Sequence, residues 1–72
     1  MHKIPNRLME IRWELGLTVE EMAEKVGLSI SAVSRIENGK RTPNQTTIRK
    51  ISIGLGLAAD KIFYIDDYYD YW

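Results

Sequence analysis

Residues 18–39 read TVEEMAEKVGLSISAVSRIENG, and this stretch decides the fold because it marks two short helices in immediate succession. Thr18 and Glu21 match the capping-box pattern, in which each side chain accepts a hydrogen bond from the other residue's backbone amide. Gly27 suits the left-handed conformation that commonly ends a helix. The pattern therefore predicts a first helix from about Thr18 to Val26.

A second helix follows the glycine at once. Ser29 is a favourable N-cap residue, and the pair Asn38-Gly39 is suited to ending the helix. The residues expected to face the core recur at helical spacing: Ala32, Val33 and Ile36. Two helices joined by so tight a turn cannot lie antiparallel, so we expect them to cross steeply. This arrangement over residues 18–38 is typical of a helix-turn-helix, which presents its second helix to the major groove of DNA.

The length and composition of the chain narrow the possible functions. Seventy-two residues form one small domain, and the sequence contains no cysteine and only one histidine, His2. We therefore expect no disulfide, no metal site, no cofactor and no enzymatic activity, since no nucleophile–base set or phosphate-binding loop is present. No apolar run is long enough to cross a membrane and no signal peptide is visible, so a cytoplasmic protein is predicted.

Charge is distributed unevenly along a chain whose formal net charge is zero. Residues 1–50 hold nine Lys or Arg against six Asp or Glu, a balance of +3. Residues 51–72 hold Lys61 against four aspartates, a balance of −3. The basic half contains the expected helix-turn-helix, which favours a nucleic-acid partner, whereas overall neutrality predicts only modest non-specific affinity for DNA.

Three more helices are expected around the motif, and no strand pattern appears. The first would run from about Asn6 to Leu15 and bury a stripe of Leu8, Ile11 and Leu15. Asn44 would cap another helix, with Ile48, Ile51 and Leu55 inside and Gly54 and Gly56 at its end. A short last helix is predicted over Ala59–Phe63. The predicted fold class is an all-α, compact five-helix domain over residues 1–63.

Residues 64–72, YIDDYYDYW, form a separate acidic and aromatic tail. Its aromatic residues recur too irregularly to predict a helix or a strand. Three interpretations remain open: the tail folds back over apolar surface such as Trp13, it extends a dimer interface, or it binds a protein partner. Its negative charge argues against contact with phosphate.

The chain resembles the Xre/Cro-like (lambda-repressor-like) helix-turn-helix repressors over about residues 6–63. The block SRIENGKRTP at positions 34–43 is the most specific shared feature. The remaining shared residues are Leu8, Ile11-Arg12, Gly16-Leu17-Thr18, Glu21 through Ala23, Val26-Gly27, Ser29, Val33, Ile48, Ile51, Leu55-Gly56 and Phe63. The resemblance implies a compact five-helix domain that binds operator DNA as a homodimer.

The resemblance also implies roles for particular residues. The base-reading positions would be Ile30, Ser31, Ser34 and Arg35. Arg35 is the best candidate for a guanine because its two donors match O6 and N7, although a phosphate contact is an equally acceptable role. The DNA backbone would be contacted by Ser29, Asn38, Lys40, Arg41 and Gln45. Arg12 and Glu37 would form an internal ion pair, and Ile53 and Leu57 would lie at the dimer interface.

Two positions depart from the family pattern. Val19 stands where relatives commonly carry a glutamine that contacts the DNA backbone, so one positioning contact is expected to be lost. Ala58 replaces a frequent serine cap, so the last helix is expected to begin irregularly, at a cost of about 1 kcal/mol.

Two classes of function fit these features. The first is a sequence-specific transcriptional regulator, such as a small repressor of phage or mobile-element type, that binds a pseudo-palindromic operator as a dimer and occludes a promoter. The second is a protein-interaction or antitoxin-like module on the same fold, with the tail contacting a partner. The neutral charge, Val19 and a reading helix poor in Gln, Lys and Asn favour the second class.

Overall fold

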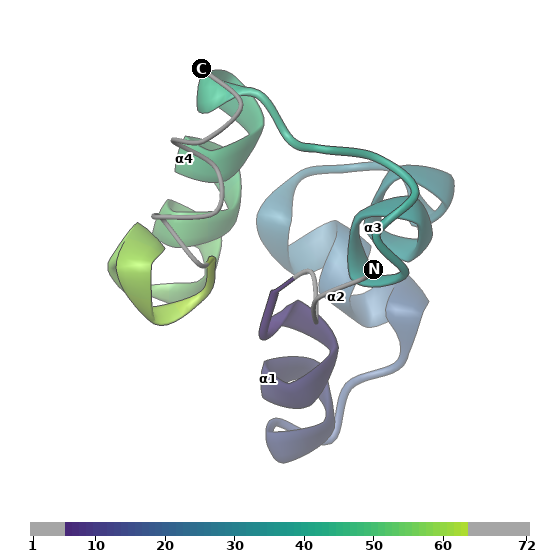
Figure 1. Ribbon diagram of the computed structural model, residues 1–72. Helices are drawn as coiled ribbons and strands as arrows, with labels where there is room; N and C mark the ends of the chain where they lie inside the picture. The colour runs from purple at the N-terminus through teal and green to yellow at the C-terminus, as the bar shows by residue number, and fades with distance from the viewer. Residues whose placement is uncertain (1–5, 64–72) are drawn as a thin grey trace.

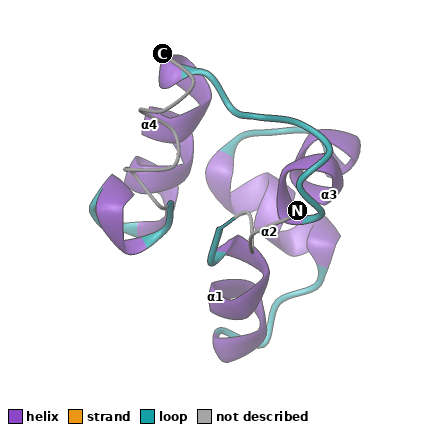
Figure 2. Ribbon diagram, in the orientation of Figure 1, coloured by secondary structure: helices purple, strands orange, loops and turns teal. Residues whose placement is uncertain are grey.

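The computed structural model describes residues 6–63. Within this range the chain forms four α-helices, α1 (Leu8–Glu14), α2 (Val19–Val26), α3 (Ile30–Glu37) and α4 (Gln45–Leu55), as Figures 1 and 2 show. The described residues contain no strand, only an isolated bridge between Asn6 and Phe63. The architecture is therefore compact and all-helical, in agreement with the predicted class.

The last predicted helix is much shorter than expected. In place of an α-helix over residues 59–63, the chain makes a single 3-10 turn, η1 (Ala59–Lys61). Ala58 precedes it in an extended conformation and provides no side-chain cap. An uncapped helix start leaves backbone amides unsatisfied, which is a physical reason for the short element at this position.

Three of the four α-helices begin at a residue whose side chain caps the helix. Thr18 Oγ1 accepts from the Glu21 amide at 3.0 Å, and the Glu21 carboxylate accepts from the Thr18 amide at 2.8 Å, which completes the predicted capping box. Ser29 Oγ accepts from the Ala32 amide at 3.0 Å, and Asn44 caps α4 in the same way. These caps fix where α2, α3 and α4 begin, as the sequence predicted.

The core lies where the four helices meet, with α2 packed against both α3 and α4 and with α1 packed against α3. Its most deeply buried large side chains come from every α-helix and from the segment after η1: Leu8, Met22, Val33, Ile36, Ile51, Ile62 and Phe63. At roughly 25 cal/mol per Å² of buried apolar surface, such a cluster is the main source of stability for a domain this small.

Gly54 is a helical residue in the last turn of α4 and does not itself end the helix. A Cβ atom placed there would stand 2.7 Å from the Lys25 carbonyl oxygen and 2.8 Å from the Val26 Cα. The glycine therefore allows the backbone of α4 to approach the last turn of α2, and Gly56, with φ of 68°, takes the helix-ending role. Our sequence interpretation of Gly54 as a helix terminator is wrong because its reason is a tertiary contact.

The α1 helix is shorter than predicted and buries a narrower stripe. It begins at Leu8 and ends at Glu14, and Leu8 and Ile11 are buried. Leu15, expected to complete the stripe, follows the last helical residue and is 52% exposed. The chain turns sharply there, because the Gly16 amide donates to the Trp13 carbonyl. Leu17, beyond the turn, packs against the core instead.

The two ends of the described chain are joined. The Arg7 amide donates to the Ile62 carbonyl at 2.7 Å, next to the bridge between Asn6 and Phe63. The buried Asn6 side chain also donates to the Ile36 carbonyl at 3.0 Å and accepts from the Leu8 amide at 2.8 Å. One side chain therefore links the start of α1 to the carboxyl half of α3.

Candidate nucleic-acid interface

The α3 helix divides into a buried face and an open face. Its buried residues are Ala32, Val33, Ile36 and Glu37. The opposite face carries Ser31, Ser34, Arg35 and Asn38 at the i, i+3, i+4, i+7 spacing that places side chains side by side. Ser34 is partly buried and the other three are exposed, as is Ile30 at 50%. All four predicted base-reading residues thus belong to one accessible surface.

An ion pair holds the buried face of α3 against α1. Arg12 Nε donates to Glu37 Oε2 at 2.8 Å, and Arg12 Nη2 donates to Glu37 Oε1 at 3.2 Å. Arg12 Nη1 also donates to the Leu17 carbonyl at 3.1 Å. The two side chains are 12% and 2% exposed, so the pair is largely removed from water. A forked geometry of this kind fixes orientation as well as distance.

Asn6 is a positioning residue that sequence reasoning did not connect with α3. The sequence placed it only at the start of the first helix, but its side-chain amide donates to the Ile36 carbonyl. The signal in the sequence was weak, because an asparagine before a helix is explained by capping alone. Arg12 and Asn6 together tie the same end of α3 to the amino-terminal part of the domain.

The carboxyl end of α3 leads directly into two exposed cations. Asn38 is the C-cap residue, Gly39 follows with φ of 72°, and the Lys40 amide donates to the Arg35 carbonyl at 2.8 Å. This is the hydrogen bond of a Schellman motif, which reverses the chain over the last turn. It places Lys40 and Arg41 beside the carboxyl end of α3. Figure 1 shows the extended loop that continues from there to α4.

The exposed charged side chains between Ile30 and Thr42 are all positive. Between Ile30 and Thr42 the cations are Arg35, Lys40 and Arg41, all exposed. The one anion in that range, Glu37, is buried and paired. The first turn of α3 contains no acidic residue, so its exposed backbone amides meet no competing carboxylate from that turn.

The remaining predicted contact residues lie at helix ends. Ser29 is the exposed N-cap of α3, and Gln45 is the exposed first residue of α4. Asn38 donates its side-chain amide to the Ser34 carbonyl at 2.8 Å. The dimer candidates lie elsewhere, on the carboxyl end of α4 and just after it: Ile53 is 73% exposed and Leu57 is 38% exposed.

A known protein family matches the part of the chain that forms the described helices. The model of the Helix-turn-helix family HTH_3 matches residues 8–62, which cover all four α-helices and η1. The chain belongs to the helix-turn-helix family. The match confirms the family predicted from the sequence, and it ends where the acidic tail begins. The tail itself lies outside both the match and the described residues.

Curated members of the helix-turn-helix family are identical to this chain at about one aligned residue in three. The transcriptional repressor RghR of Bacillus subtilis is 37% identical over 89% of the chain and 48% of its own length. An uncharacterised regulator of Methanothermobacter thermautotrophicus is 36% identical over 83% of the chain and 88% of its own length. Control protein C.MunI of Mycoplasma sp is 37% identical, covering 81% and 80%. The chain thus spans about half of RghR.

Residues 6–63 hold no group of three His, Cys, Asp or Glu side chains arranged to bind a metal ion. No helix in that part of the chain has the length and apolar character needed to cross a membrane.

Proposed function

We propose that this chain is a sequence-specific DNA-binding transcriptional regulator that docks α3 in the major groove. The observation that carries the proposal is the open face of α3, which is free of exposed acid and continues into Lys40 and Arg41. Phosphate contacts by these two cations would set the register on the duplex, and the open face would meet base edges. Membership in a family that contains transcriptional repressors supports the same function.

Within this mechanism Arg35 is the main specificity residue. Its guanidinium can donate two hydrogen bonds to guanine O6 and N7, whereas Ser31 and Ser34 accept several bases and discriminate weakly. Ile30, at the exposed start of α3, would pack against a thymine methyl group. Ser29 and the amino end of α3 would bind a phosphate, and Asn38 and Gln45 would contact the neighbouring backbone.

The active form is a homodimer on a pseudo-palindromic operator, related through the exposed Ile53 and Leu57. A two-fold axis there would place two copies of α3 about 34 Å apart, one turn of the duplex, or at a multiple of that distance. Bound in this way, a protein of phage or mobile-element type would repress by occluding a promoter. An Ile53→Asp variant should sediment as a monomer, and a retained dimer would place the interface elsewhere.

Selection from random double-stranded DNA tests the proposal directly. The expected result is an enriched pseudo-palindrome whose affinity exceeds that for random DNA by at least about 10³ and falls linearly with the logarithm of salt concentration. The spacing of its half-sites would report the distance between the two reading helices. An Arg35→Ala variant selected in parallel should enrich a site that has lost one defined base.

A flat selection would point to the other class of function. If no sequence is enriched and binding is weak and fully suppressed by salt, the domain acts as a protein-interaction or antitoxin-like module. The neutral net charge of the chain is the observation that favours this alternative. The acidic tail would then be the first region to test for a protein partner.

A further inference from the structure

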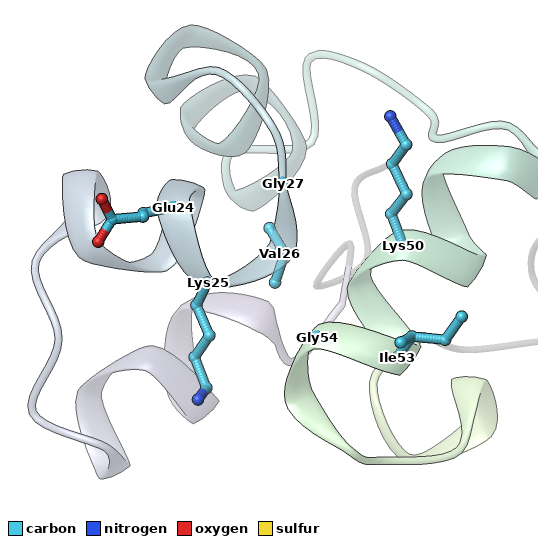
Figure 3. Close-up of a pocket in the computed structure, with 7 residues that line it drawn as sticks. All are labelled: Glu24, Lys25, Val26, Gly27, Lys50, Ile53 and Gly54. Carbon is cyan, nitrogen blue, oxygen red and sulfur yellow. The ribbon is translucent and has the colours of Figure 1, made fainter.

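A groove between α2 and α4 is separate from the DNA-facing surface. It has a volume of about 360 Å³, and the close approach at Gly54 forms part of its wall. Val26 and Gly27 supply apolar lining, and Lys25 and Lys50 stand at its edges, as Figure 3 shows. Ile53 also borders the groove, but its side chain points away from Val26 in Figure 3 and stays open to a dimer contact. The groove therefore combines an apolar floor with cationic rims.

The two lysines of the groove lining outnumber its one glutamate. Within residues 6–63 neither Lys25 nor Lys50 takes part in an ion pair, and both are exposed. Glu24 also lines the groove, but its carboxylate points away from α4 in Figure 3. The two ammonium groups point in opposite directions, so the cationic rims lie apart. A partner that suits this surface would carry several separated anions and apolar or aromatic groups between them.

We propose that the acidic aromatic segment 64–72 binds this groove within the same chain. Its acidic residues form two groups, the pair Asp66-Asp67 and the single Asp70, with two tyrosines between them, so anions and aromatic rings alternate along it. Tyrosine and tryptophan rings can cover apolar surface and lie against lysine ammonium groups at the same time. The segment follows directly on Phe63, which is 1% exposed in the core.

The segment is long enough to reach across the molecule, and charge favours the groove over the other exposed apolar surface. Nine residues reach at most about 30 Å, comparable with the 31 Å longest dimension of the molecule. Trp13 on α1 and Leu15 just after it are 65% and 52% exposed and offer a second apolar patch. The carboxylate of Glu14 beside that patch would repel three aspartates, whereas Glu10 is paired with Arg7. The groove is lined by two lysines and one glutamate, so its net charge favours an acidic segment.

The absence of cysteine from the sequence makes the contact easy to locate. We would introduce Tyr71→Cys into the full chain, attach a nitroxide spin label, and measure paramagnetic broadening of every backbone amide signal. The expected result is selective broadening at residues 25–27 and 53–54, with the amides of Trp13 and Glu14 spared. Broadening centred on Trp13, or spread evenly over the domain, would overturn the proposal.

Two controls make the assignment specific. The paired substitutions Lys25→Glu and Lys50→Glu should abolish the broadening, whereas Arg49→Glu, an equal charge change on an exposed α4 residue, should leave it intact. A mixture of isotope-labelled protein without the spin label and spin-labelled protein without the isotope tests for a second copy. Broadening that appears in this mixture at the same strength would overturn binding within one chain. The test does not depend on DNA binding, so it stands whether or not an operator is found.

Discussion

The two helices of the motif, α2 and α3, begin alike and differ in what surrounds their amino ends. Each is eight residues long, and each is capped by a hydroxyl that accepts from the amide three residues on. The first turn of α2 adds Glu20 and Glu21, whereas the first turn of α3 has no acid. Over its length α2 holds three glutamates and one lysine, a net charge of −2.

The amino end of α2 is therefore stabilised by carboxylates of its own first turn, whereas the first turn of α3 has none. Carboxylates near the amino end of α2 complement its dipole and contribute about 0.3–1 kcal/mol each. In α3 the same stabilisation is missing, and the place of a carboxylate is open to an external anion such as a DNA phosphate. The only acid of α3 is Glu37, at the opposite end and turned into the core.

The largest effect is expected at that buried glutamate. Glu37→Ala leaves Arg12 buried without its partner, so the free energy of unfolding should fall by about 3–5 kcal/mol, close to the total for a domain of this size. The helical circular dichroism signal should then be lost at room temperature. Glu24→Ala, on the exposed face of α2, should change stability by less than about 0.5 kcal/mol.

Rescue of the Glu37 defect distinguishes a buried charge from a lost contact. Arg12→Met combined with Glu37→Leu removes both charges and should restore most of the stability. A double variant as unstable as Glu37→Ala would show that the pair is required for packing rather than for neutralisation.

The next largest effect is expected at Arg35, and it should appear in DNA binding alone. Arg35→Ala should weaken binding to the selected operator by about 1–3 kcal/mol while the thermal midpoint stays unchanged. The control is Lys25→Ala, which removes the one cation of α2 and should leave operator affinity as it was. Equal losses in the two variants would mean that the protein responds to total charge rather than to the reading helix.

A smaller effect is expected when the amino end of α3 receives a carboxylate like those of α2. This change is the most direct test of the comparison. Ser29→Asp keeps a good N-cap and adds a negative charge, so stability should hold or rise by up to about 1 kcal/mol. Operator affinity should fall about tenfold, or about 1.4 kcal/mol, because the carboxylate occupies the phosphate position. Thr18→Asp on α2 should leave affinity unchanged, and a matching fall there would argue against a special role for α3.

The smallest effect concerns the loop after α3. Arg41→Ala should lower the magnitude of the salt dependence of binding by about 0.9 in the logarithmic slope, the value for one lost phosphate contact. Sequence preference in a repeated selection should not change. An altered preference would instead place Arg41 among the base-reading residues.

What could be predicted from the sequence was what local chemistry determines. The caps at Thr18, Ser29 and Asn44 specify their helices through side chains only three residues away, and all three are formed. The exposed face of α3 followed from the same spacing that defined its core face. Tertiary contacts were not accessible in this way, such as the close approach of Gly54 to the backbone of α2 and the hydrogen bond from Asn6 to the Ile36 carbonyl.

Leu15 shows a second limit of periodicity. Its spacing from Ile11 is correct for one helical face, but α1 ends at Glu14, and the turn at Gly16 directs Leu17 toward the core instead. The residues proposed to contact DNA are a third case, because the sequence defines the face of α3 but not its angle on the duplex. That angle depends on how two copies associate.

The bridge between Asn6 and Phe63 brings the two ends of the described domain to the same place. Any polypeptide joined before Asn6 or after Phe63 leaves the domain from the same place. Domains whose ends meet in this way can be inserted into or fused with other proteins without being pulled apart. In RghR the matching region accounts for 48% of the length, so a domain of this family can form part of a larger architecture. A reporter or effector module joined directly before Asn6 or after Phe63 would therefore start from the same side of the domain.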